Sequence, residues 1–78
     1  MKQNLILVIN AGSSSLKFKL FDDRLKEKAE GIVERIGIAG SFISYEFGSK
    51  KKKKELKIIN HDAAMNAIID IFNEEKID

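Results

Sequence analysis

The chain has 78 residues, of which 44% are hydrophobic and 33% are charged, and it contains no cysteine or proline. A chain of this length forms one domain or part of one, because a single core usually involves on the order of 100–150 residues. The composition excludes a disordered or fibrous chain, and the lack of cysteine excludes disulfides and thiolate-bound zinc. We therefore expect a globular fold, located in the cytoplasm because nothing in the sequence requires an oxidising compartment.

The net charge of +2 depends on one run of five lysines, Lys50 to Lys54, without which the charge would be negative. A lysine run without interleaved aromatic residues is typical of a solvated loop, so we expect no nucleic-acid partner. The alternative is a small nucleic-acid binder that uses this run to neutralise phosphates. The apolar run at residues 5–9 is too short to cross a bilayer, and we expect no membrane partner.

The first part of the chain predicts two strands that flank a turn. Residues 5–9 are continuously aliphatic, which predicts a strand buried on both faces, and residues 10–15 (Asn-Ala-Gly-Ser-Ser-Ser) have strong turn chemistry. Residues 16–20 then alternate between apolar residues and lysine, as in a strand with one face on a core. We expect a hairpin over residues 5–21.

Further strands follow this hairpin. Alternating apolar residues predict a third strand at about residues 28–36, and the glycine-containing residues 37–41 predict a loop. Alternation resumes at residues 42–47, and the aliphatic residues 56–59 are expected to return beside them. This arrangement predicts a second hairpin spanning residues 42–59, with the lysine run at or beside its tip.

The last part of the chain predicts a helix over residues 61–75. Asn60 is placed to cap it, and Asp62 lies near its positive end. The residues with helical spacing, which should pack on the sheet, include Ala64, Met65, Ile68, Ile69, Ile71 and Phe72. Five strands followed by one helix indicate an α+β meander with a single helix on one sheet face. No domain boundary is evident, so residues 1–78 are treated as one unit.

The turn between the first two strands is the part of the sequence that indicates chemistry. Phosphoryl transfer needs hydrogen-bond donors aimed at phosphate oxygens. Gly12 would allow a positive φ and a close backbone approach, so that successive N–H groups form an anion-binding nest. Short hydroxyl donors are added by Ser13, Ser14 and Ser15. The motif is not a P-loop, because it lacks that spacing and opens a strand where a P-loop opens a helix.

Strand parity refines this interpretation. Asn10 shares one face of the first strand with Val8, and Lys17 shares one face of the second with Ser15, so these polar groups could converge near the turn. A glycine and serine cluster is also typical of a hydrophilic hairpin turn without function, and the residues alone leave that alternative open.

The string VINAGSSSLKF at residues 8–18 resembles the opening signature of the acetate kinases, members of the acetate and sugar kinase, heat-shock protein and actin superfamily. Residues 34–37 (Glu-Arg-Ile-Gly) resemble the same family. Butyrate kinases are less similar, since they tend to have proline at the position of Ala11, whereas a propionate kinase is nearly indistinguishable. The resemblance implies an α/β enzyme of the ribonuclease H-like or actin-like ATPase type, of which residues 1–78 form part of the N-terminal subdomain.

The resemblance also implies an activity, the transfer of the γ-phosphoryl group of ATP to acetate, giving acetyl phosphate and ADP with Mg²⁺ bridging the phosphates. By motif matching, Asn10 would be catalytic and contact the transferred phosphoryl group or, directly or indirectly, Mg²⁺. Lys17 would support the turn electrostatically. The residues expected to bind the phosphates of ATP are Gly12, Ser13, Ser14, Ser15 and Lys17.

Other parts of such a site are implied to lie beyond residue 78: acceptor-binding arginines, an acid/base aspartate, the adenosine pocket and a magnesium carboxylate. We therefore expect this chain to supply the phosphate-binding turn, to be inactive alone, and to come from a homodimeric enzyme. The alternatives are part of a propionate or butyrate kinase and a non-catalytic anion-binding or interaction module. Surface, turn or capping positions are expected for the remaining candidates, Asp22, Asp23, Arg24, Arg35 and His61.

Overall fold

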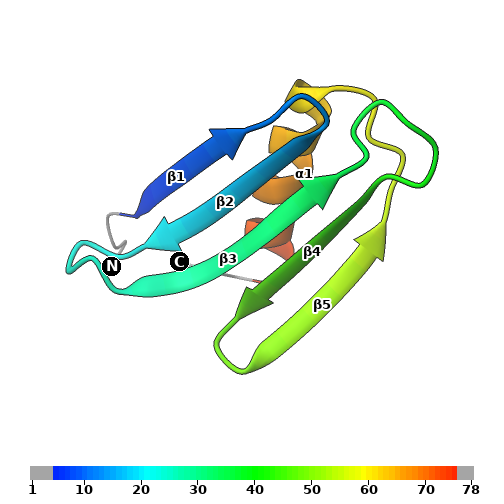
Figure 1. Cartoon of the computed structure of the whole chain (residues 1–78). Coiled ribbons are helices and arrows are strands. Elements are labelled where there is room, and N and C mark those ends of the chain that lie inside the picture. The colour runs from blue at the N-terminus through cyan, green and yellow to red at the C-terminus, as the bar shows by residue number, and fades with distance from the viewer. Residues whose placement is uncertain (1–4, 76–78) are drawn as a thin grey trace.

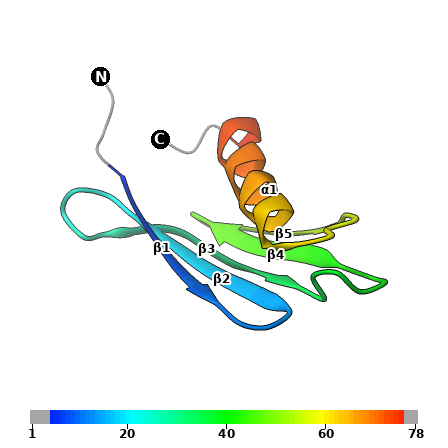
Figure 2. The ribbon, with the colours of Figure 1, turned by 90° about the horizontal axis from the view of Figure 1, so that it is seen from above.

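A computed structural model describes residues 5–75, which form a five-stranded antiparallel sheet with one helix packed on one face (Figure 2). The strands lie side by side in chain order (Figure 1), so the predicted α+β meander is confirmed. The elements are β1 (Ile6–Ala11), β2 (Ser15–Phe21), β3 (Glu27–Glu34), β4 (Phe42–Phe47), β5 (Lys50–Glu55) and α1 (His61–Glu74). The helix of this described part is too short to span a membrane.

The core lies between the three central strands and α1. Strand alternation turns one set of apolar side chains toward the helix and leaves the lysines of β2 on the opposite face. Phe18 of β2 meets Phe72 of α1 edge to face, with ring centroids 5.7 Å apart. The buried residues that form this cluster are Leu16, Phe18, Val33, Ile36, Ile43, Tyr45, Ile58, Ala64, Ile68 and Ile71.

Helix α1 begins and packs as its sequence predicts, with one exception. The Asn60 side chain caps it by accepting a hydrogen bond of 2.8 Å from the amide of Ala63. Ile69 was expected to pack on the sheet, but it is 45% exposed. Ile68 is fully buried, and successive helical residues are rotated by about 100°, so its neighbour Ile69 is directed away from the sheet.

Strand β1 differs from its predicted burial. Its aliphatic run was expected to be covered on both faces, yet Ile6 is 43% exposed and Val8 is 49% exposed. The prediction is wrong because β1 is an edge strand that pairs only with β2 and extends beside the helix rather than under it (Figure 2). Leu7 contacts the core from this strand as a partly buried residue.

The lysine run begins beside a hairpin tip, as predicted, but it forms strand β5 itself, so the prediction of a solvated loop is wrong. The tip is Gly48–Ser49, where Gly48 has a φ of 57°, and Phe47 pairs with Lys50 across it. Glycine with positive φ at the first position of a two-residue loop closes a hairpin tightly, so the lysines follow at once as the returning strand.

Charged and aromatic groups compensate the lysines on both faces of β5. On the helix side, Lys52 lies 2.7 Å from the carboxylate of Glu75, and Lys54 lies 2.6 Å from that of Glu74. On the other face the Lys53 ammonium lies 4.3 Å from the ring centroid of Phe42. Several short contacts therefore dock this strand onto its neighbours.

Residues 56–59, predicted as a strand, instead cross the end of the sheet toward α1. The amide of Gly37 donates to the carbonyl of Ile58 at 2.8 Å, and the amide of Ile58 donates to Ser41 Oγ at 2.9 Å. The loop at residues 37–41 therefore takes the backbone bonds that a strand partner would supply. Similarly, β3 ends at Glu34 and not at residue 36, because Arg35 has a φ of 57°.

Gly31 of β3 allows a close approach in the core. A Cβ atom placed on it would lie 2.6 Å from the Phe18 ring and 2.6 Å from the carbonyl oxygen of Ser44. Gly31→Ala should therefore lower the free energy of unfolding by about 1–3 kcal/mol, since a backbone carbonyl cannot move away cheaply. Urea denaturation of both chains measures this. Glu30→Ala, on the solvent face of the same strand, is the control, and equal losses in both variants would contradict the explanation.

The raised pKa of the Tyr45 hydroxyl should make the protein less stable at high pH. Burial of this hydroxyl and its hydrogen bond of 2.8 Å to the Glu75 carboxylate together raise the pKa from 10.0 to about 12, with burial the larger cause. Between these two values the unfolded chain releases the proton while the folded chain retains it, so the free energy of unfolding should fall as pH rises from about 10 to about 12.

Tyr45→Phe should remove this part of the pH dependence. Denaturation midpoints of the two chains, measured across that window, give the difference, and ionisation can be followed directly because the chain has a single tyrosine. If the denaturation midpoints of the two chains change equally with pH, Tyr45 ionisation does not contribute to the loss of stability.

Candidate functional site

The turn between β1 and β2 is closed by Gly12, but not through the predicted positive φ. The amide of Gly12 donates to the carbonyl of Ser15 at 2.9 Å, and the φ of Gly12 lies outside the left-handed region. Glycine is needed here for space: Ser15 Oγ lies 2.7 Å from where a Cβ atom of residue 12 would be. The predicted close approach at Gly12 is therefore confirmed, whereas the predicted left-handed conformation of Gly12 is wrong.

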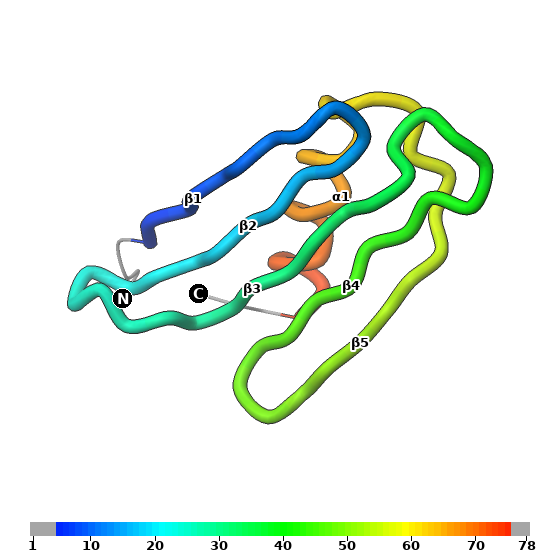
Figure 3. Tube along the Cα trace, in the orientation of Figure 1, coloured from blue at the N-terminus to red at the C-terminus, as the bar shows by residue number. Residues whose placement is uncertain are grey.

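Three of the four carbonyl oxygens of residues 12–15, those of Gly12, Ser14 and Ser15, are bound by groups of the protein. The carbonyl of Gly12 accepts a hydrogen bond of 2.8 Å from Nε2 of His61, the first residue of α1. The carbonyl of Ser14 accepts one of 3.0 Å from the amide of Ile36, beyond the end of β3. Figure 3 shows the turn beside the start of α1 and the end of β3, the two elements that supply these donors.

The amides of the turn are free to bind something else. In a trans peptide the C=O and the following N–H point in opposite directions, so the bond to His61 turns the Ser13 N–H away from the helix. Within the described residues, the amides of Ser13 and Ser14 donate to no other protein group. Two free amides beside the bound carbonyls of Gly12 and Ser14 add partial positive charge at the tip of the turn, which favours an anion there.

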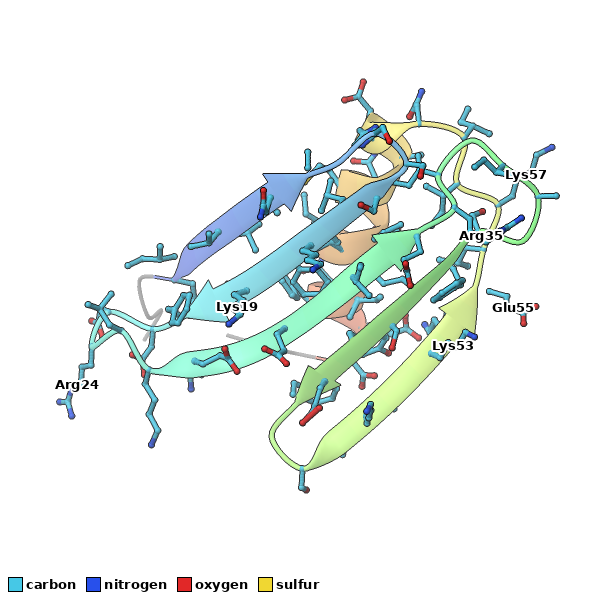
Figure 4. All side chains as sticks on the ribbon, in the orientation of Figure 1. Lys19, Arg24, Arg35, Lys53, Glu55 and Lys57 are labelled. Carbon is cyan, nitrogen blue, oxygen red and sulfur yellow. The ribbon has the colours of Figure 1, made fainter. Side chains whose placement is uncertain are left out.

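Asn10 and Lys17 lie next to this turn on the same face of the sheet. They are direct cross-strand partners, in agreement with the predicted convergence of polar groups near the turn, and both are exposed on the face turned away from α1. Figure 4 shows Lys19 on this open face as well. Lys19 has acidic partners within 4 Å in Glu27 and Glu30, whereas Lys17 forms no ion pair in the part of the chain that the structure describes.

Taken together, the donors near the turn are of three kinds. They are two backbone amides, the serine hydroxyls and one lysine ammonium, and an exposed amide side chain lies beside them. Cross-strand partners in an antiparallel sheet have Cβ atoms about 5 Å apart, so Asn10 and Lys17 can contact one small ligand at the same time. The structure brings together all of the residues that the sequence predicted for the site, although their roles remain predictions.

The donor set suits phosphate oxygens better than a bare metal ion. Residues 5–75 contain no cluster of three or more histidine, cysteine or acidic side chains that could hold a metal. Mg²⁺ usually keeps several waters and is bound through one or two protein oxygens and substrate phosphates. Asn10 can supply one such oxygen, which fits a metal that arrives with the nucleotide.

The charged residues outside this group have structural partners. Asp22 accepts hydrogen bonds of 2.9 Å from the amides of Lys26 and Arg24, and the bond from Lys26 is the main cause that lowers its pKa. Arg24 lies at the far end of the sheet, in the β2–β3 turn (Figure 4). Arg35 donates from Nε to the carbonyl of Ala39 at 2.8 Å. These are the turn positions that the sequence predicts.

His61 is the residue whose contact the sequence did not reveal. It was expected at a surface or capping position, and it is partly buried against a turn 49 residues earlier in the chain. A single histidine at a helix start gives no signal of such a distant partner. Only the packing of α1 on the sheet brings the two together.

Gly12 and Ser15 should show coupled effects on stability. Gly12→Ala places a methyl group on Ser15 Oγ and should cost about 0.5–1.5 kcal/mol as the hydroxyl leaves its rotamer. Ser15→Ala should relieve much of this cost in the double variant, because the Ser15 Cβ atom is 4.0 Å away. A double-mutant cycle by urea denaturation measures the coupling, and strictly additive effects would contradict the contact.

Comparison with known proteins identifies the family. Residues 5–78 match the acetokinase family. Acetate kinase of Mycoplasma genitalium is 40% identical over 77 residues, covering 99% of this chain and 19% of that protein. Acetate kinase of Staphylococcus carnosus is 46% identical over 68 residues, covering 86% of this chain and 17% of that protein. The chain thus spans about a fifth of the length of these relatives.

Solved structures have the same fold. The crystal structure of Porphyromonas gingivalis acetate kinase matches with a TM-score of 0.87 and 32% identity, covering 92% of this chain and 18% of that one. A propionate kinase from Francisella tularensis matches with a TM-score of 0.80 and 27% identity, covering 97% of this chain and 19% of that one. Sequence and fold agree, and the chain belongs to the acetokinase family, a family of kinases.

Proposed function

We propose that the protein containing this chain transfers the γ-phosphoryl group of ATP to acetate, and that the turn at residues 12–15 holds the phosphates during transfer. The observation that supports the proposal most is that the carbonyls of Gly12 and Ser14 are bound by protein groups while the amides of Ser13 and Ser14 have no partner within residues 5–75. The names of the relatives give the reaction class, since they are called acetate kinases.

The turn contributes chiefly electrostatic stabilisation. Phosphoryl transfer spreads negative charge over the equatorial oxygens, and catalysis depends on donors that are already in place before the reaction. The amides and hydroxyls of Ser13 and Ser14 would face these oxygens, and Ser15 adds a third hydroxyl. The ammonium of Lys17, which forms no ion pair within residues 5–75, adds a full positive charge. Mg²⁺, when bound with the nucleotide, neutralises further phosphate charge.

Asn10 is the residue of this chain that we assign to catalysis. Its side-chain amide carries two N–H donors and one carbonyl oxygen, so it can donate to the transferred phosphoryl group and offer an oxygen to the metal or to a metal-bound water. It is exposed at the end of β1, across from Lys17. Strand β1 holds the residue on a regular element, which positions a side chain better than a loop does.

The rest of the active site is proposed to come from other parts of the protein. The chain covers about a fifth of its relatives, so acceptor binding, the adenosine pocket and the remaining metal ligands belong to segments outside it. We propose a cytoplasmic, homodimeric enzyme, in which this segment is inactive alone. Propionate is the second candidate acceptor, because a propionate kinase shares the fold with a TM-score of 0.80.

Asn10→Ala in the full-length protein should lower kcat for acetyl phosphate formation by about 10²–10³-fold, the effect of losing one transition-state donor. A coupled assay for ADP with ATP, Mg²⁺ and either acetate or propionate measures the rate and identifies the acceptor. Thermal stability should change little, since the side chain is exposed.

Asn66→Ala is the matched control, because Asn66 is an exposed asparagine on α1. Its kcat should equal that of the unmodified protein. Equal rates for the Asn10→Ala and unmodified proteins would refute the role of Asn10. Phosphate binding without any transfer in the unmodified protein would instead support the non-catalytic anion-binding module.

A further inference from the structure

We propose that His61 is a positioning residue that keeps the amides of the β1–β2 turn directed at the phosphates. This inference rests on the proposed function of the turn and adds a residue to it. Its observation is the hydrogen bond of 2.8 Å between His61 Nε2 and the carbonyl oxygen of Gly12. The bond connects the first residue of α1 to the most flexible residue of the turn.

The chemistry of the bond fixes which atom carries the proton. A carbonyl oxygen only accepts hydrogen bonds, so Nε2 of His61 must be the donor. In a hairpin loop of two residues, the Gly12 carbonyl would ordinarily accept from the Ser15 amide. The described backbone bonds include the one from the Gly12 amide to the Ser15 carbonyl but not this reverse one. His61 therefore replaces the usual partner of the Gly12 carbonyl.

The bond from His61 to the Gly12 carbonyl determines whether the tip of the turn exposes an N–H donor or a carbonyl oxygen. The peptide between residues 12 and 13 has its carbonyl on His61 and its N–H on the opposite side. Rotation of that peptide would turn the carbonyl oxygen outward and the N–H of Ser13 inward. A phosphate would then meet a partially negative oxygen in place of a donor, and binding would be repulsive.

Glycine makes the restraint necessary. Gly12 has access to more backbone conformations than any other residue, so this peptide plane rotates easily without a partner. The space that glycine provides is nevertheless required, since Ser15 Oγ lies only 2.7 Å from where a Cβ atom of residue 12 would be. Gly12 thus allows the close contact with Ser15, and it also introduces the backbone freedom that the hydrogen bond from His61 removes.

Helix α1 is a rigid support for the histidine. Asn60 caps the helix immediately before His61, and Ala64 and Ile68 in the following turns are fully buried against the sheet. The ring is itself partly buried. Because the helix is fixed by the core, its first residue can hold the turn in place before any nucleotide binds.

A set of substitutions distinguishes this role from simple packing. In His61→Gln the side-chain nitrogen is as many bonds from Cα as Nε2 of histidine, so it can donate to the Gly12 carbonyl. In His61→Asn the amide is one bond too short, and His61→Leu has no donor. Asp62→Asn, at an exposed neighbouring position, is the control.

Steady-state kinetics of the full-length protein test the proposal. His61→Leu and His61→Asn should lower kcat/KM for ATP by at least about tenfold, because a misdirected amide no longer stabilises phosphate charge. His61→Gln should recover to within about threefold of the unmodified protein. KM for ATP should rise in His61→Leu and His61→Asn while KM for the acceptor acid stays unchanged, whereas a general loss of folding would lower apparent kcat and leave both KM values unchanged.

A ligand-free measurement separates the two proposals. The ¹³C′ NMR chemical shift of Gly12 reports whether its carbonyl accepts a hydrogen bond, and it should move in His61→Leu and His61→Asn but not in His61→Gln. An unmodified protein that does not transfer phosphoryl groups would refute the proposed function. An active unmodified protein with kcat/KM unchanged in His61→Leu, or with His61→Gln as impaired as His61→Leu, would refute the role of His61 alone.

Discussion

The packing of α1 against the central strands is the interaction on which the other features depend. Residues from β2, β3 and β4 supply one apolar face, and the apolar residues of α1 close it. Burial of this kind contributes about 25 cal/mol for each Å² of apolar surface removed from water. Once the helix is fixed on that face, its first turn lies beside the β1–β2 turn, and its last turn lies beside β5.

The two ends of α1 therefore have different roles. At the start, His61 binds the Gly12 carbonyl in the β1–β2 turn, whereas at the end Glu74 and Glu75 bind lysines of β5. The two glutamates at the end of the helix neutralise part of the positive charge of β5, an edge strand made almost entirely of lysine. The lysine charges on this edge also discourage pairing with other chains. A segment that looks from its composition like a flexible loop thereby becomes part of the sheet.

Local sequence patterns predicted much of this fold and of the candidate site. The period of two in β2, the helical spacing after Asn60 and the glycine and serine cluster at residues 12–15 each describe one element without reference to others. Such signals depend on the backbone geometry of a short segment, which the residues in that segment determine. Strand parity also indicated that Asn10 and Lys17 could converge near the turn, and the structure adds that they are direct cross-strand partners.

The features that were missed depend on distant parts of the chain. The lysine run has no intrinsic strand signal, and it pairs with β4 because Gly48 closes the hairpin directly before it. The exposure of β1 follows from its place at the sheet edge, which its aliphatic run cannot report. The contact between His61 and Gly12 joins residues 49 positions apart and exists only after α1 has packed.

The turn shows how a small segment can prepare a binding site without the rest of an enzyme. A donor stabilises developing charge most when no reorganisation is needed at the moment of reaction. Here the peptide after Gly12 is oriented by a protein atom, because its carbonyl accepts a hydrogen bond from His61. The packing of α1 on the sheet therefore also fixes the orientation of the Ser13 amide. In the proposed function of the turn, a change at the helix start would alter phosphate binding even if every residue of the turn were unchanged.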